Sequence, residues 1–153
     1  MAPSISKILA TGFGSGKVPF APGTAGTIVA IPIVLLLNQL HLWWYLLFVI
    51  GGFVLGVKIC DKVAKEYQEQ DPARIVWDEI IGFSVSMLLI PLSLWSILIA
   101  FVLFRFFDIV KPLPISYLER KLTGGFGIMA DDLLAGIFTW GCLQLIMLTG
   151  WYF

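Results

Sequence analysis

Charged side chains are scarce in this sequence: Asp, Glu, Lys and Arg together make up 13% of its 153 residues. A soluble domain carries about 25% charged residues, so this chain could not cover a water-facing surface. Its hydrophobic fraction is 59% and its mean hydropathy is +0.93. These values exclude a soluble globule, a disordered chain and a coiled coil, and they indicate a small polytopic membrane protein.

Other absences narrow the function classes. Ten Lys and Arg residues balance ten Asp and Glu residues, so we expect no basic field and no nucleic-acid partner. The single histidine, His41, falls on the charge-free side of the membrane in the topology derived below, which argues against histidine-based catalysis. Cys60 and Cys142 form no CxxC pair, so neither a disulfide framework nor a zinc site is expected. No apolar signal-peptide core is evident near the N-terminus.

Four apolar stretches are present, at residues 24–37, 42–57, 80–110 and 133–153. A membrane-spanning helix needs about 20 apolar residues, so the first two stretches are short. The third is interrupted at Pro91, where a helix cannot continue its hydrogen bonding normally. We therefore predict an all-α, membrane-embedded helical bundle formed by a single domain over residues 1–153. It would have about five transmembrane or partly spanning helices and a short glycine-rich N-terminal loop.

The charges favour a hairpin over one long helix in the third stretch. With a turn at Pro91, all ten cations fall on one side of the membrane, in the N-terminal segment and in segments 58–79 and 105–132. With one long helix they would split six to four. The positive-inside rule favours the hairpin and a cytoplasmic location for the charged side. The opposite side would hold an aromatic belt comprising His41, Trp43, Trp44, Trp95, Trp151 and Tyr152.

Five carboxylates are predicted to lie at the water boundary of three helices: Asp78, Glu79, Asp108, Asp131 and Asp132. Helix capping explains one member of each doublet. It does not explain Asp108. This residue lies at the C-terminal end of a helical pattern, where the helix dipole disfavours an anion. A carboxylate cluster without histidine favours a hard divalent ion, by default Mg²⁺, and such ions commonly act on phosphate esters.

Cations and glycines accompany the carboxylates. Arg105 and Lys111 flank Asp108, and either an anion site or a plain salt bridge fits this spacing. The segment GFGSGKVPFAPGTAGT includes Ser15, Lys17 and Thr24. Its glycines would let the backbone approach a phosphate, although a flexible connection would look the same.

Four blocks together resemble the phosphatidylglycerophosphatase A family: GFGSGKVPFAPGTAGT, VWDEIIGF, FRFFDIVKPLPI and GGFGIMADDLLAGI. The resemblance implies a Mg²⁺-dependent phosphatase of the bacterial inner membrane with its active site facing the cytoplasm. Phosphatidylglycerophosphate would be converted to phosphatidylglycerol and inorganic phosphate. Catalysis and metal binding would fall to Asp78, Glu79, Asp108, Asp131 and Asp132, and phosphate binding to Arg105, Lys111, Lys17, Ser15 and Thr24.

Four matters stay open at this point. A small transporter or channel could use the same carboxylates as an ion site, although its polar residues should then extend across the membrane. For the enzyme, the sequence does not choose between direct attack by water and an aspartyl-phosphate intermediate. Neither the oligomeric state nor the number of metal ions follows from the residues.

Overall fold

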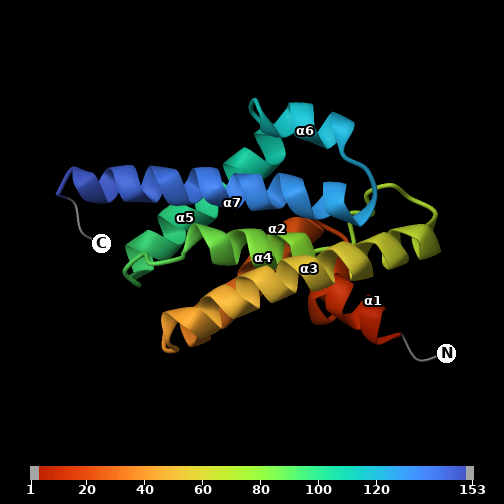
Figure 1. The fold of residues 1–153 in the computed structure, drawn as a ribbon, viewed down its shortest axis with the longest axis horizontal. Helices are drawn as coiled ribbons and strands as arrows, with labels where there is room; N and C mark the ends of the chain where they lie inside the picture. Colours follow the sequence, from red (N-terminus) through yellow and green to blue (C-terminus); the bar gives the residue numbers. More distant parts are fainter. Residues whose placement is uncertain (1–3, 151–153) are drawn as a thin grey trace.

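The computed structural model describes residues 4–150, and these fold into helices joined by turns (Figure 1). No β-strand occurs within these residues, so the predicted all-α class is confirmed. In chain order the elements are α1 (Ile5–Ala10), the 3-10 helix η1 (Gly12–Lys17), α2 (Pro22–Leu37), α3 (Leu42–Tyr67), α4 (Trp77–Ser86), α5 (Leu94–Val110), α6 (Ile115–Lys121) and α7 (Gly124–Leu148).

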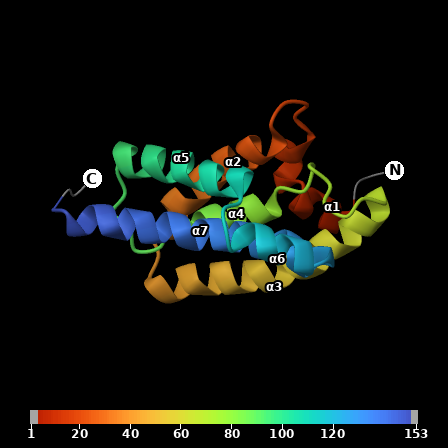
Figure 2. The same ribbon diagram turned by 90° about the horizontal axis from the view of Figure 1, so that it is seen from above.

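The short helix α4 lies at the centre of the bundle. Every residue of α4 except Val85 is buried, and α2, α3, α5 and α7 all contact it. Figures 1 and 2 show α4 enclosed by these longer helices from two directions. Its apolar side chains, including Ile80, Ile81 and Phe83, form the middle of the main hydrophobic core. The first turn of α4, which carries Asp78 and Glu79, is therefore held by packing on several sides.

Two polar side chains fasten α3 to α4. The indole Nε1 of Trp77 donates to the carbonyl oxygen of Gly52 at 2.9 Å. The Tyr45 hydroxyl donates to the carbonyl oxygen of Ser84 at 2.7 Å. Both bonds are buried, where an unpaired donor or acceptor would be costly, and they fix the register of the two helices.

The predicted hairpin in residues 80–110 is confirmed, and the alternative of one long helix is wrong. Helix α4 ends at Ser86 and α5 begins at Leu94. The Ser93 hydroxyl caps α5 by accepting from the Ser96 backbone N–H at 2.9 Å. Near the other end of the hairpin, Arg105 Nη1 lies 3.9 Å from Glu79 Oε1. The start of α4 and the end of α5 therefore meet, as the charge distribution predicts.

The number of predicted spans needs correction. Two helices, α3 with 26 residues and α7 with 25, are long and apolar enough to cross a membrane, fewer than the predicted five or so. Helices α2, α4 and α5 have only 16, 10 and 17 residues. At 1.5 Å per residue, α4 is only about 15 Å long. The apolar residues of these shorter helices are instead shared between the core and the outer surface.

One end of the bundle carries exposed tryptophan side chains. The beginnings of α3 and α5 lie at one end in Figure 1, and the end of α3, α6 and the beginning of α7 lie at the other. Trp43, Trp44 and Trp95 are exposed at the first end, in agreement with the predicted aromatic belt. Trp151 and Tyr152, which were assigned to the same belt, lie outside the described residues.

Candidate active site

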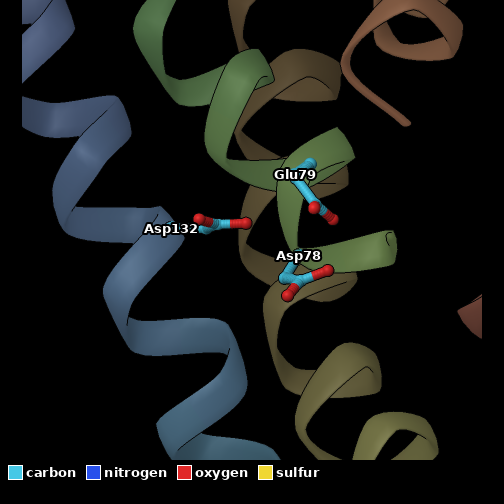
Figure 3. A group of neighbouring side chains, drawn as sticks. All are labelled: Asp78, Glu79 and Asp132. Atoms are coloured by element: carbon cyan, nitrogen blue, oxygen red, sulfur yellow. The ribbon is translucent and has the colours of Figure 1, made fainter. Parts of the chain in front are cut away.

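Three buried carboxylates converge between α4 and α7. Asp78 and Glu79 come from the first turn of α4, and Asp132 comes from α7. One carboxylate oxygen from each lies within 4.8 Å of those of the other two. Figure 3 shows the Asp132 carboxylate pointing toward the two acids of α4. We call Asp78, Glu79 and Asp132 the carboxylate triad.

The position of Asp131 and Asp132 within their helix differs from the expectation. The apolar pattern placed them at the beginning of the last helix, whereas α7 begins at Gly124 and both acids lie about two turns inside it. Neither acid is in the first turn, so helix capping explains neither of them. The reason is packing: a Cβ at Gly125 would overlap the carbonyl oxygen of Val57, so the missing side chain lets α7 begin directly against α3.

Close backbone packing brings the triad together. A Cβ built on Gly136 of α7 would overlap the carbonyl oxygen of Gly82 on α4. A Cβ on Gly82 would lie 2.5 Å from the Asp132 carbonyl oxygen. The two glycines therefore permit an approach between α4 and α7 that any larger residue would prevent. This approach brings Asp132 within reach of Asp78 and Glu79.

Arg105 and Asp108 extend the site on α5. The Arg105 guanidinium forms an ion pair with Asp108 and faces Glu79. Gly23, near the start of α2, makes room for it: a Cβ there would clash with Glu79 Oε1 and lie 2.9 Å from Arg105 Nη1. Sequence reasoning missed Gly23, because nothing in a glycine-rich segment marks which glycine faces the site.

Lys111 organises a second group of charges beside the triad. Its ammonium Nζ lies 2.6 Å from Asp131 Oδ2 and 2.6 Å from Glu119 Oε1. Asp131 therefore faces Lys111, and it is not a member of the triad. Glu119, in α6, was not predicted, since it belongs to the short charged segment ISYLERK and carries no distinguishing sequence signal.

A cavity of about 470 Å³ opens next to Asp131. The end of α3, residues 69–71, the end of α6 and the first turns of α7 line it. Its charged lining residues are Asp61, Lys65, Glu69, Asp71, Glu119, Arg120 and Asp131. The cavity thus reaches the Lys111 group directly, and Asp131 connects it to the neighbourhood of the triad.

The predicted residues of the N-terminal segment have different surroundings. The Ser15 hydroxyl donates to the Gly12 carbonyl oxygen at 2.9 Å, within η1. Lys17 is exposed and lines a separate cavity to which none of the five predicted carboxylates contributes. Thr24 lies in the first turn of α2, next to Gly23. Of these three residues, only Thr24 is adjacent in sequence to a residue that touches the site.

Burial makes the triad electrostatically unusual. Burial raises the pKa of Glu79 to about 8, and the negative charge of Asp132 adds to the effect. Burial and the adjacent Glu79 also raise the pKa of Asp78. Within residues 4–150, Asp78 Oδ1, Glu79 Oε2 and Arg105 Nε are buried and have no hydrogen-bond partner. The site therefore holds closely spaced acids that resist ionising together, and it has unused ligand atoms.

These properties fit a divalent cation. Every donor in the triad is a carboxylate oxygen, the ligand type that Mg²⁺ and Ca²⁺ prefer. A bound cation would satisfy the unpartnered oxygens and remove the repulsion among the three acids. The unpartnered Arg105 N–H, on the edge of the same group, suits the oxygen of an anionic ligand.

Comparison with known proteins agrees with this chemistry. The family model described as phosphatidylglycerophosphatase A matches residues 8–147. The chain belongs to the phosphatidylglycerophosphatase A family. Phosphatidylglycerophosphatase A of Escherichia coli K12 is 42% identical over 140 residues, covering 91% of this chain and 81% of the relative. That of Haemophilus influenzae is 46% identical over 133 residues, covering 86% of this chain and 82% of the relative.

A third relative broadens the range of lipids named for these proteins. A Bacteroides thetaiotaomicron protein, named provisionally as a phosphatidylinositol-3-phosphatase, is 40% identical over 140 residues, covering 86% of this chain and 87% of the relative. No solved structure matches the chain. As a member of the phosphatidylglycerophosphatase A family, the protein is an enzyme, a lipid phosphatase, and the transporter alternative is set aside.

Proposed function

We propose that this protein hydrolyses the terminal phosphate of phosphatidylglycerophosphate to give phosphatidylglycerol and inorganic phosphate, in anionic phospholipid biosynthesis. The observation that carries the proposal is the carboxylate triad beside Arg105. Two relatives are named for this reaction, and this chain aligns with more than 80% of the length of each. The triad and Arg105 supply what the reaction needs, namely a place for a cation and a donor for phosphate oxygens.

Asp78, Glu79 and Asp132 would hold Mg²⁺. When bound, the metal would polarise the terminal phosphate and lower the pKa of a coordinated water. Asp108 would hold the Arg105 guanidinium in place through their ion pair. Arg105 would then bind two phosphate oxygens, and Lys111 would bind a third from the neighbouring group.

Hydrolysis adds a water oxygen to phosphorus and breaks the bond between phosphorus and the glycerol oxygen. The departing glycerol oxygen takes up a proton, and a carboxylate of the site accepts one from the water that either attacks phosphorus directly or cleaves an aspartyl-phosphate intermediate. Asp131 remains paired with Lys111, so its negative charge would hold the lysine beside the cavity that Asp131 lines. Burial of the triad excludes bulk water, which strengthens each of these electrostatic interactions.

We place the protein in the bacterial inner membrane, with the triad at the cytoplasmic boundary. All ten cations lie in residues 7–17, 58–74 and 105–121, the segments that the predicted topology brings to one side of the membrane. That distribution is typical of the cytoplasmic side. The lipid phosphate would approach the site from that interface while its acyl chains stay in the bilayer.

Phosphate release from phosphatidylglycerophosphate by the purified protein in detergent tests the proposal. We expect release with Mg²⁺ and none with a chelator. Phosphatidylinositol 3-phosphate, assayed in parallel, tests whether this chain shares the activity for which the Bacteroides relative is named. Folded protein that releases no phosphate in either metal condition would overturn the proposed function, and release unaffected by the chelator would overturn the metal assignment.

A further inference from the structure

A second cavity, of about 290 Å³, lies in the N-terminal segment away from the triad. Lys7, Ile8, Thr11, Phe13, Gly14 and Lys17 line it. Both charged residues of this lining are cations, in contrast to the mixed lining of the cavity beside Asp131. The cavity is formed by α1 and η1, which precede the first helix of the bundle proper.

The positive charge at this cavity is not neutralised by nearby acids. Lys7 Nζ lies 4.5 Å from the centroid of the Tyr67 ring, and the Arg74 guanidinium carbon lies 5.5 Å from the same centroid. Over the described range 4–150, neither these two residues nor Lys17 forms an ion pair with a carboxylate. By comparison, Arg105 and Lys111 are both paired with acids. The cavity therefore attracts an anion from outside the protein.

Large apolar side chains are exposed in the same N-terminal segment, and Phe13 lines the cavity itself. Phe13 is 64% exposed, Phe20 is 85% exposed and Ile5 is 77% exposed. Phe13 and Gly14 both have left-handed backbone conformations, which turn the Phe13 ring outward. Exposed aromatic rings beside unpaired lysines are unfavourable in water but suit the boundary between headgroups and acyl chains.

We propose that this cavity binds the headgroup phosphate of an anionic phospholipid, at a site separate from the one that performs hydrolysis. Lys7 and Lys17 contact the phosphate, and the acyl chains lie along Phe13 and Phe20. The apolar surroundings select a lipid over free phosphate, because inorganic phosphate would leave both rings in water. Lys17, expected from the sequence to bind the substrate phosphate, instead acts at this second site.

Fluorine NMR with 4-fluorophenylalanine at position 13 tests the proposal, because the label reports on this cavity and not on the triad. The full chain, in zwitterionic micelles, is titrated with dihexanoylphosphatidylglycerol, with dihexanoylphosphatidylcholine and with inorganic phosphate. We expect a saturable shift of the fluorine signal with phosphatidylglycerol alone. The double variant Lys7→Gln/Lys17→Gln should weaken this binding about tenfold or more, and Lys17→Gln alone should weaken it by a smaller factor.

Lys58→Gln/Lys62→Gln provides a charge-matched control, since both lysines are exposed on α3 and neither lines the cavity. Binding by this variant should be unchanged. Equal shifts with the phosphatidylcholine lipid, or saturation by inorganic phosphate alone, would overturn the lipid assignment. Unchanged affinity in Lys7→Gln/Lys17→Gln and in Lys17→Gln, with circular dichroism showing intact helices, would overturn the site itself.

Discussion

Gly136 of α7 faces the backbone of Gly82 on α4 so closely that a Cβ at position 136 would overlap the Gly82 carbonyl oxygen. This contact sets the distance between the two helices that carry the triad. Gly136→Ala should push α7 away from α4, at a cost of about 1–3 kcal/mol in the free energy of unfolding. Activity should fall with it, because Asp132 would move relative to Asp78 and Glu79. Unfolding in detergent and phosphate release measure the two effects.

Gly141→Ala in the same helix is the matched control. A Cβ at Gly141 would meet nothing within 4 Å. Alanine there should leave activity unchanged and stabilise α7 by about 0.5–1 kcal/mol, because glycine is a poor residue inside a helix. Equal losses of activity in the two variants would show that helix spacing does not position the triad.

Removing one triad carboxylate should impair both metal binding and hydrolysis. We expect Asp132→Asn to lower activity about 100-fold or more, since it removes a charge from the proposed cation site. Electron paramagnetic resonance of bound Mn²⁺ should show weaker binding in the variant. Glu66→Gln, at an exposed acid of α3, serves as the control and should change neither quantity. Normal Mn²⁺ affinity in Asp132→Asn would remove this residue from the metal site.

Lys111 and Lys65 are both paired with an aspartate, but in different surroundings. Lys65 is 76% exposed and pairs with Asp61, whereas the Lys111 side chain is only 20% exposed. Lys111→Gln should raise KM for the phospholipid about tenfold, the value of one charge-assisted hydrogen bond to the substrate phosphate. Lys65→Gln should leave KM and kcat nearly unchanged. A normal KM in Lys111→Gln would exclude Lys111 from substrate binding.

The raised pKa of Glu79 predicts a pH dependence of stability when metal is chelated. Its folded pKa of about 8 lies above the ordinary value of 4.5, so the folded state holds a proton that the unfolded state releases. This contribution is fully present below pH 4.5 and is lost as the pH rises through 8. Unfolding midpoints in detergent with a chelator should therefore fall over this range.

Two comparisons isolate the contribution of Glu79. Glu79→Gln cannot titrate, so its unfolding midpoint should depend less on pH than that of the unsubstituted protein. Adding Mg²⁺ should restore stability at the alkaline end, because a ligand that binds the folded state stabilises it. An identical pH profile in Glu79→Gln would show that the proton is held elsewhere.

The parts predicted correctly from the sequence follow from strong chemical rules. The break predicted at Pro91 lies in the connection between Ser86, where α4 ends, and Leu94, where α5 begins. The positive-inside rule required the start of α4 and the end of α5 to lie on the same side, and the contact between Arg105 and Glu79 agrees with this. The acidic residues were singled out because carboxylates are costly beside apolar segments unless something uses them, and their roles in catalysis and metal binding stay predictions. The convergence of Asp78, Glu79 and Asp132 fits that expectation.

The parts predicted incorrectly depend on contacts between distant segments. The last apolar stretch began at residue 133, yet residues 124–127 form the first turn of α7, where Gly125 lies against α3. The separation of Asp131 from the triad depends on Lys111, twenty residues earlier in the chain. The number of spans was too high because apolar composition does not distinguish a lipid-facing helix from one as enclosed as α4.

The enclosure of α4 also constrains how the protein is made. Its two acids are present in the growing chain more than 50 residues before Asp132 has been synthesised. Until α7 arrives, α4 lacks the partner that covers it, and the charges of its first turn lack the third carboxylate. Insertion of the earlier helices thus cannot by itself complete the enzyme. With the triad as the proposed catalytic site, competence begins only when α7 packs into place, so hydrolysis would be a property of the finished chain and of no nascent intermediate.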